Sequence, residues 1–178
     1  MKSDKRKGIL IVGAGILQVP AVQKAKELGY YVYITDKNIN SEAAKLADQA
    51  FKISTKDINS HIKLAVELKS KEKIVAVYTQ GCDVEYTVAM AANAAGLPGI
   101  KPEAALNCND KIKMREILNK KEVDSVKYFS CKSQEDAIRA VQKVGYPCIV
   151  KPLDNSASRG VTILYNGCNS SDVVKAYN

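Results

Sequence analysis

Short apolar runs alternate with helical segments over the first hundred residues, and this alternation restricts the possible folds most strongly. The runs are residues 8–12, 31–35, 50–53 and 74–78. Helices are expected between and after them, at residues 20–28, 42–47, 59–69 and 83–95. Gly8–Val12 is apolar throughout, as in a strand that is buried on both faces of a parallel sheet. Strands that alternate with helices in this way predict an α/β fold with a Rossmann-like parallel sheet.

A segment rich in Pro and Gly, residues 97–102, separates two parts of the chain. We therefore expect one domain over residues 1–100 and a second over residues 101–178. The second part predicts a small α+β domain. Its expected helices are residues 102–107 and 110–119, a helix that starts in a capping box at Ser133 and Asp136, and one from Asn169. Its expected strands are residues 126–129, 148–150 and 161–164.

Gly13-Ala14-Gly15 follows the first predicted strand, and Asp36 follows the second. This arrangement allows two interpretations. One is a dinucleotide-binding turn, although Gln18 stands where the third glycine of that fingerprint would be. The other is a tight turn between strand and helix. In either case the turn can form an anion site at the start of the helix.

Asp83 and Glu85 follow the strand at residues 74–78. Open α/β sheets bind ligands at the carboxyl ends of their strands. The two carboxylates can therefore hold a substrate ammonium group. They can equally be acids of the first helical turn that interact with the helix dipole.

The stretch at residues 146–164 predicts a strand, a polar loop and a second strand. The loop, residues 153–160, is longer than a usual hairpin loop and is built from small polar residues. Its amides, its hydroxyl groups, Arg159 and the nearby Lys151 suit phosphate oxygens. The alternative is an ordinary surface hairpin. The chain contains no P-loop motif of the Walker type.

The chain carries 27 basic and 19 acidic side chains, a formal charge of +8, which favours an anionic partner. We do not expect a nucleic-acid partner, because no basic run with interleaved aromatic residues occurs. The five cysteines form no Cys-x-x-Cys motif, and their odd number fits a reduced, cytoplasmic setting. No apolar stretch approaches membrane-spanning length, so we expect no membrane partner.

Taken together, the motifs of the second half resemble those of the ATP-grasp superfamily, and the closest similarity is to proteins like the large subunit of carbamoyl phosphate synthase. The matching pieces occur in the family's order: Asp110-Lys111-x-x-Met114-Arg115, Ser133-x-Glu135-Asp136-Ala137, residues 145–152 and residues 156–161. The first half is similar to the domain that precedes the ATP-grasp domain in these proteins, which has a Rossmann-like sheet and usually does not bind NAD. The resemblance covers nearly the whole chain.

The resemblance implies an ATP site and assigns its residues. Lys111 and Lys151 match lysines that contact ATP, and the loop that closes over the phosphates is matched by Ser156, Ser158, Arg159 and Gly160. Ala157 and Arg159 depart from the family pattern, because glycines are frequent there. The resemblance also implies Mg²⁺, with metal ligands expected outside this chain.

The activity implied is that of a ligase that activates a small carboxylate as an acyl phosphate and passes it to an amine or related nucleophile. The chain is expected to be the front portion of such an enzyme, inactive alone, with a missing C-terminal half or a homo-oligomeric partner. Gly13, Gly15, Asp83 and Glu85 are the expected substrate-binding residues. Two alternatives are a non-catalytic Rossmann-like module that binds a nucleotide or a metabolite, and a basic nucleic-acid-binding domain.

Overall fold

The computed structural model describes residues 6–123, 126–153 and 160–178. The chain forms two compact units, residues 1–106 and 107–178. The division falls within helix α5 (Pro102–Asn109). The domain boundary expected after residue 100 lies just before this helix and stays a prediction.

The first unit is built on a parallel sheet of four strands. These are β1 (Gly8–Val12), β2 (Tyr31–Asp36), β3 (Gln49–Lys52) and β4 (Ile74–Tyr78), and they lie in the order β3-β2-β1-β4. In the central strand, Leu10 is in register with Tyr33 of β2 and Val77 of β4. All the pairings are parallel, which confirms the predicted α/β fold with a Rossmann-like sheet.

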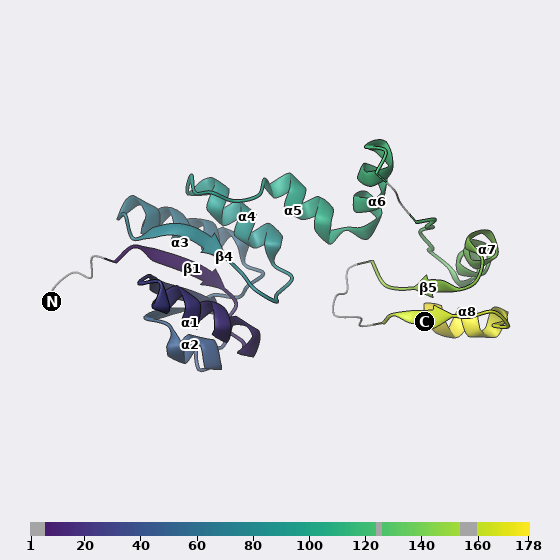
Figure 1. Ribbon diagram of the computed structural model, residues 1–178, viewed down its shortest axis with the longest axis horizontal. Helices are drawn as coiled ribbons and strands as arrows, with labels where there is room; N and C mark the ends of the chain where they lie inside the picture. Colours follow the sequence, from purple (N-terminus) through teal and green to yellow (C-terminus); the bar gives the residue numbers. More distant parts are fainter. Residues whose placement is uncertain (1–5, 124–125, 154–159) are drawn as a thin grey trace. The chain divides into compact units, whose positions relative to one another are not determined.

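Helices cover both faces of this sheet (Figure 1). The short 3-10 helix η1 (Ile16–Gln18) leads into α1 (Val19–Glu27), and α1 and α2 (Glu42–Leu46) lie on one face, where Ile11 and Ile34 pack against Val22. α3 (Ile58–Ser70) and α4 (Glu85–Ala94) lie on the other face, where Leu10 packs near Leu64. Successive residues of β1 thus point into opposite cores. This is why the strand is apolar throughout rather than alternating.

His61 of α3 is fully buried beneath the sheet. Its Nδ1 lies 2.7 Å from the carbonyl oxygen of Asp57, and its Nε2 lies 2.8 Å from Oγ1 of Thr35. A carbonyl oxygen only accepts, so Nδ1 carries the proton and Nε2 accepts from the Thr35 hydroxyl. Burial lowers the pKa of His61, against the opposing effect of Asp57. The neutral imidazole therefore ties α3 to the end of β2.

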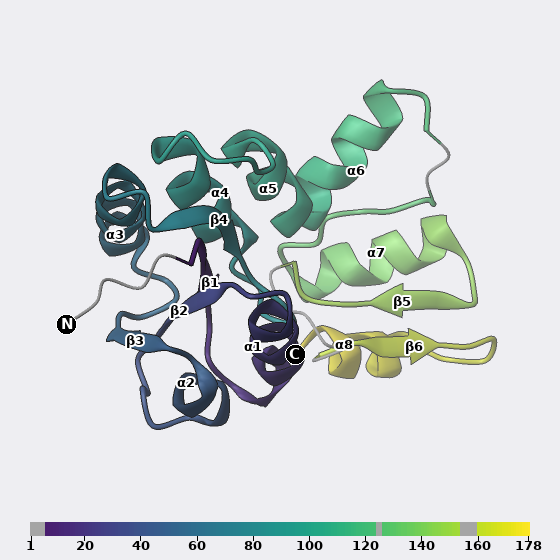
Figure 2. The ribbon, with the colours of Figure 1, turned by 60° about the vertical axis from the view of Figure 1, so that its left-hand side comes forward.

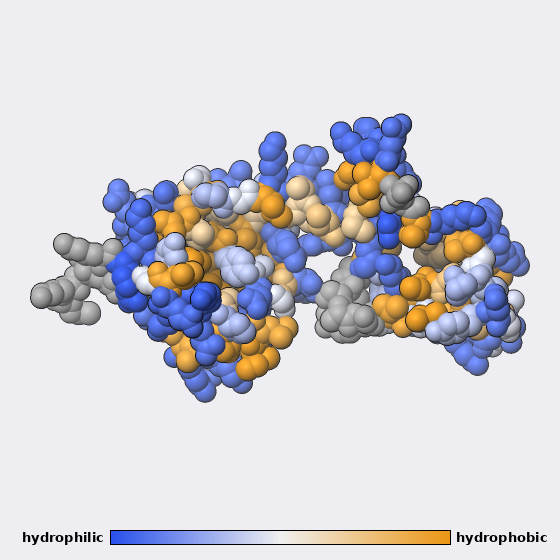
Figure 3. All heavy atoms as spheres, viewed as in Figure 1, coloured by the Kyte–Doolittle hydropathy of each residue, from blue (hydrophilic) through white to orange (hydrophobic). Residues whose placement is uncertain are grey.

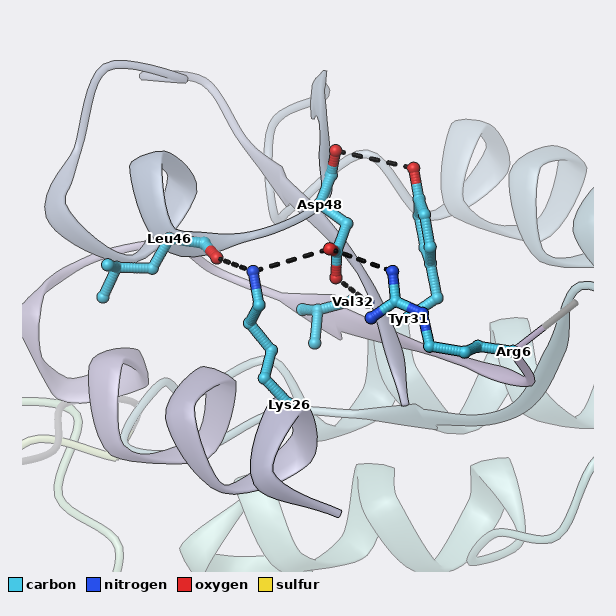
Figure 4. A network of polar contacts seen from close by, with 6 residues as sticks. All are labelled: Arg6, Lys26, Tyr31, Val32, Leu46 and Asp48. Carbon is cyan, nitrogen blue, oxygen red and sulfur yellow. Dashed lines mark hydrogen bonds and ion pairs between the residues drawn. The ribbon is translucent and has the colours of Figure 1, made fainter. Parts of the chain in front are cut away.

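Asp48 ties the start of β3 to its neighbours (Figure 4). Its Oδ2 accepts from the amide of Val32 at 2.8 Å, and its Oδ1 lies 3.3 Å from Arg6 and 3.5 Å from Lys26. The Asp48 amide in turn donates to the carbonyl of Val32 at 3.0 Å. Burial raises the pKa of Asp48, but the Val32 amide and the two cations together outweigh that effect and lower it. A side chain thus extends the ladder between β2 and β3 by one step.

In its described residues, the second unit contains a two-stranded antiparallel sheet and three helices besides the end of α5. β5 (Cys148–Val150) pairs with β6 (Thr162–Leu164), so that Ile149 faces Ile163 across the ladder (Figure 2). The helices are α6 (Lys111–Lys120), α7 (Gln134–Val144) and α8 (Ser170–Tyr177). Val141 of α7, Leu164 of β6 and Val173 of α8 form the core with Ala137. This mixed unit agrees with the predicted small α+β domain.

The strand expected at residues 126–129 is wrong, because these residues form no ladder with β5 or β6 in the described chain. Their β-branched and aromatic composition favours a strand, but a strand also requires a partner edge. Val126 is 63 % exposed and Phe129 is 47 % exposed. Instead of joining the sheet, these residues line a cavity.

The predicted capping box at Ser133 is only half formed. The Ser133 hydroxyl accepts from the amide of Asp136 at 3.0 Å, but Asp136 accepts from the amide of Lys132 rather than that of Ser133. A complete capping box lies at the start of α8, between Asn169 and Asp172.

Candidate functional site

The carboxyl edge of the four-stranded sheet gathers four connecting segments around one cavity of about 580 Å³. The segments follow β1, β2, β3 and β4, which are parallel and therefore end at the same edge. Gly13 and Gly15, two of the expected substrate-binding residues, line this cavity. The other lining residues are Ile16, Leu17, Gln18, Asp36, Lys37, Ser54, Thr55, Lys56, Gly81 and Cys82.

Asp36 is used as an acceptor by the chain itself. Its Oδ2 accepts from the amide of Ala14 at 2.9 Å, and its Oδ1 accepts from the amide of Asn38 at 2.9 Å. In a dinucleotide site the carboxylate at this place would bind a ribose hydroxyl. Here it stabilises the glycine turn, which favours the tight-turn interpretation over dinucleotide binding.

Gln18 occupies the concave side of the same turn. It is 4 % exposed, and its Nε2 donates to the carbonyl of Gln80 after β4. A Cβ atom on Gly15 would lie 3.3 Å from Oε1 of Gln18, and one on Gly13 would lie 3.5 Å from its Cδ. Gln18 therefore takes the space beside both glycines and joins the turn after β1 to the segment after β4.

Asp83 and Glu85 lie beyond Cys82, and neither is among the lining residues of the cavity. Val84 is the N-cap of α4 and Glu85 its first residue, so Asp83 precedes the helix. Burial raises the pKa of the Cys82 thiol, and Asp83, Asp36 and Glu85 raise it further. Three carboxylates thus lie near enough to Cys82, a lining residue of the cavity, to raise the pKa of its thiol. Oε2 of Glu85 is buried and has no hydrogen-bond partner in the described part of the chain.

The second unit contains its own cavity, of about 1150 Å³, which Lys111, Lys151 and Gly160 line together. Asp110 caps α6 by accepting from the amides of Ile112 and Lys113, and this fixes Lys111 in the first position of the helix. Nζ of Lys111 donates to the carbonyl of Leu153 at 2.7 Å. This bond connects the start of α6 to the segment that follows Lys151.

Three of the expected ATP-binding residues, Ser156, Ser158 and Arg159, lie outside the described residues. Gly160 has φ +70°, in the left-handed region where glycine is favoured. The roles in ATP binding assigned to Lys111, Lys151 and Gly160 stay predictions.

Further lining residues of this cavity were not identified from the sequence. They include residues 126–131, of which residues 126–129 were predicted to form a strand, and Lys175, which belongs to no motif. Hydrophobic side chains reach the surface near β5 and β6, among them Ile149 and Ile163 (Figure 3). In the sequence, the one signal for such a surface is that apolar residues stand next to lysines, as Val126 does next to Lys127.

Among residues 6–123, 126–153 and 160–178, no group of three or more His, Cys, Asp or Glu side chains is arranged to hold a metal ion. The same ranges contain no helix long and apolar enough to cross a membrane.

The fold of the chain is shared with proteins of known structure. The chain superimposes on N5-carboxyaminoimidazole ribonucleotide synthetase in complex with ADP with a TM-score of 0.77 at 20% identity, covering 100% of this chain and 46% of that one. The resemblance to the ATP-grasp superfamily is confirmed. More specifically, residues 110–177 match the family described as carbamoyl-phosphate synthase L chain, ATP binding domain.

Curated relatives agree with this assignment. The chain is 27% identical over 176 residues to formate-dependent phosphoribosylglycinamide formyltransferase of Methanocaldococcus jannaschii, which covers 94% of this chain and 42% of the relative. It is 39% identical over 77 residues to alanine--anticapsin ligase of Bacillus subtilis, covering 43% of this chain and 16% of that protein. The chain therefore spans less than half the length of these relatives.

Proposed function

We propose that this chain is the nucleotide-binding front portion of an ATP-dependent carboxylate–amine ligase that works through an acyl phosphate. The observation that carries the proposal is the cavity of the second unit. It brings Lys111 and Lys151 together within the segment that matches an ATP-binding domain.

The charges around this cavity suit a polyphosphate. Five basic side chains line it, and no carboxylate is among its described lining residues; the five are Lys111, Arg115, Lys127, Lys151 and Lys175. Lys111 also stands at the positive end of the α6 dipole, a position that disfavours a cation unless an anion binds there. A bound phosphate chain would interact favourably with both the basic side chains and the positive end of the α6 dipole.

The apolar part of the lining suits a base. Val126, Phe129 and Ile149 lie on it, and a planar heterocycle can bury its faces against such side chains. A cavity with apolar walls and convergent cations therefore matches both ends of ATP.

The donor set does not by itself hold a metal ion. Mg²⁺ is bound through carboxylates together with phosphate oxygens, and the described lining contains no Asp or Glu side chain. When bound, the ion would supply positive charge that neutralises the phosphate oxygens. We propose that its protein ligands lie outside the residues that form this cavity, and that the 178-residue chain alone does not turn over ATP.

The cavity of the first unit is the proposed substrate site. Gly13 and Gly15 line it, and Asp83 and Glu85 follow the lining residue Cys82 in the chain. Asp83 and Glu85 stay proposed acceptors for the amine of a substrate, although neither lines the cavity; Oε2 of Glu85 is buried and has no hydrogen-bond donor among the described residues. All five cysteines are free thiols, which is consistent with the cytoplasmic location that we propose.

The test is ATP affinity in a Lys151→Ala variant, measured by isothermal titration calorimetry. One charge-assisted contact contributes about 1.5–3 kcal/mol, so affinity should fall by roughly ten- to a hundredfold. Lys120→Ala is the matched control, because Lys120 is an exposed lysine of the same unit that does not line the cavity. Equal ATP affinity of the Lys151→Ala variant and the parent, with unchanged circular dichroism, would overturn the assignment.

A further inference from the structure

We propose that Cys148 and Cys168 of the second unit are a redox-sensitive pair, which a small disulfide such as oxidised glutathione converts into an intramolecular disulfide bond that weakens nucleotide binding. Formation of the bond depends only on the two thiols. Its effect on the nucleotide rests on the proposed ligase function, because Cys148 lines the cavity assigned to ATP.

The small sheet places Cys148 on the core side of the second unit. Cys148 pairs with Leu164 across the ladder of β5 and β6. Residues directly opposite each other in an antiparallel pair lie on the same face, and Leu164 is only 2 % exposed. The next pair lies on the other face, where Ile149 is 58 % and Ile163 is 48 % exposed. The Cys148 side chain therefore packs against the core that α7, β6 and α8 form.

A turn after β6 brings Cys168 back to the same core. The amide of Cys168 donates to the carbonyl of Tyr165 at 3.1 Å, and Gly167 between them has φ +97°. Cys168 packs against the same core cluster as Cys148. The hydroxyl of Tyr146, two residues before Cys148, donates to the carbonyl of Cys168 at 3.1 Å. The chain before β5 and the chain after β6 are therefore held together where the two cysteines lie.

The electrostatics agree with this arrangement and separate the pair from a third thiol. Burial raises the pKa of the Cys148 thiol, and Cys168 raises it further, an interaction that requires the two groups to be near each other. Cys131 packs against the same core, but its Sγ donates to the carbonyl of Phe129 at 3.9 Å. The pKa of its thiol is raised by burial and by Asp136, not by another cysteine.

The pair can adjust to the geometry of a disulfide. The bond forms where the Cα atoms are about 4.4–6.8 Å apart. The turn that carries Cys168 can shift to meet this requirement, because residues 165–167 are exposed and lie outside the core cluster. Both cysteines are half-buried, so a small oxidant can reach them.

The reaction is thiol–disulfide exchange. The thiolate of one cysteine attacks oxidised glutathione, forms a mixed disulfide and releases one glutathione thiolate. The thiolate of the second cysteine then attacks the protein sulfur of the mixed disulfide and releases the second glutathione thiolate. The two protein thiols thus lose two electrons and two protons, and two glutathione thiols form.

The bond would act on the nucleotide cavity through β5. Cys148 lines this cavity, and so does Lys151, which follows the last residue of the strand. Cys168 is not among the described lining residues, so a bond to it draws the Cys148 sulfur away from its place in the wall. The shift also moves the strand that carries Lys151. Partial loss of one charge-assisted contact corresponds to a fall in ATP affinity of about three- to tenfold.

The experiment begins with the 178-residue chain in buffers that contain reduced or oxidised glutathione. The remaining thiols are alkylated, and the digested chain is mapped by mass spectrometry. We expect the peptides of Cys148 and Cys168 to be joined, with two hydrogen atoms lost. Cys168→Ser should abolish this bond, whereas the control variants Cys131→Ser and Cys108→Ser should retain it. Circular dichroism verifies that each variant is folded.

Calorimetry then compares ATP affinity before and after oxidation. Oxidation should lower the affinity of the parent and of Cys131→Ser by about three- to tenfold, and it should leave that of Cys168→Ser unchanged. Cys168→Ser is the suitable variant because Cys168 does not belong to the described lining of the cavity.

The proposal would be overturned by an oxidised chain that contains only glutathione adducts, a bond to Cys131 or no bond at all. Equal ATP affinity of the reduced and the disulfide-bonded parent would overturn it as well. If the reduced chain binds no ATP, the proposed ligase function fails, and the peptide map still decides separately whether the two cysteines form a pair.

Discussion

Replacement of Asp48 by alanine should destabilise the first unit more than replacement of any exposed charged residue of that unit by alanine. Asp48 is the side chain that satisfies the amide of Val32, at 2.8 Å, and it also faces the cations of Arg6 and Lys26. Its own side chain is 16 % exposed. The truncation therefore leaves a backbone donor in the sheet without its acceptor.

The magnitude follows from these contacts. A buried donor left without an acceptor costs about 1–3 kcal/mol. The ion pairs add less, about 0.2–1 kcal/mol, because Arg6 and Lys26 are each 40 % exposed and screened by water. The free energy of unfolding should thus fall by about 1–4 kcal/mol. Asp48→Asn keeps an oxygen for the Val32 amide and loses only the charge, so it should cost about 1 kcal/mol.

Urea unfolding followed by far-ultraviolet circular dichroism measures the loss, and hydrogen exchange at the Val32 amide localises it. Exchange at Val32 should accelerate in Asp48→Ala and change little in Asp48→Asn. The pKa of Asp48 is lowered in the folded chain, so its stabilisation is present above the usual value of 3.8 and is lost as the pH falls through the folded pKa. If both variants unfold at the same urea concentration as the parent, the contacts of the Asp48 side chain contribute nothing to the free energy of unfolding, and the reasoning is refuted.

Two further changes test the first unit. Burial lowers the pKa of His61 below its usual 6.5, so the free energy of unfolding should decrease as the pH falls below that value. The slope should be at most about 1.4 kcal/mol per pH unit. Urea titrations at a series of pH values measure this slope, and the His61→Gln variant should lack it. Gly81→Ala should lower the thermal unfolding midpoint more than Gly29→Ala: both residues have positive φ, but a Cβ atom on Gly81 would lie 3.1 Å from Leu17, whereas one on Gly29 would have no atom within 4 Å. Equal midpoints for the two glycine variants would show that the Leu17 contact yields without cost.

The parallel sheet could be predicted because its strands are buried on both faces. Ile11 and Leu10 are adjacent in the chain and pack into opposite cores, so the pattern is a continuous apolar run that few other folds require. The helices between the runs follow from their periodicity and from glycines such as Gly29, which has φ +81°. The apolar runs, the helical periodicity and the glycines that end helices each depend on residues close together in the chain, so they can be read from the sequence.

The segment at residues 126–129 could not be assigned in the same way. A Val-x-Tyr-Phe pattern describes side chains that prefer an extended backbone, but pairing depends on whether an edge is present. The described sheet of the second unit consists of β5 and β6, and the segment lines a cavity instead. The cavity-lining lysines outside motifs, Lys37 and Lys56, were missed for a related reason. Only the register of β2 with β3 brings them together.

The glycine turn shows why a sequence fingerprint and a binding site are different things. The amide of Gly13 donates to the carbonyl of Thr35 at 2.9 Å, and the amide of Ala14 donates to Asp36 at 2.9 Å. Pro20, in the first turn of α1, has no amide hydrogen to offer. These two amides are satisfied by the chain and are not available to a phosphate, even though the glycines of the turn permit a close approach. An anion at this edge of the sheet would therefore need other groups as well, and Lys37 and Lys56 are the cations among the described residues that line the cavity.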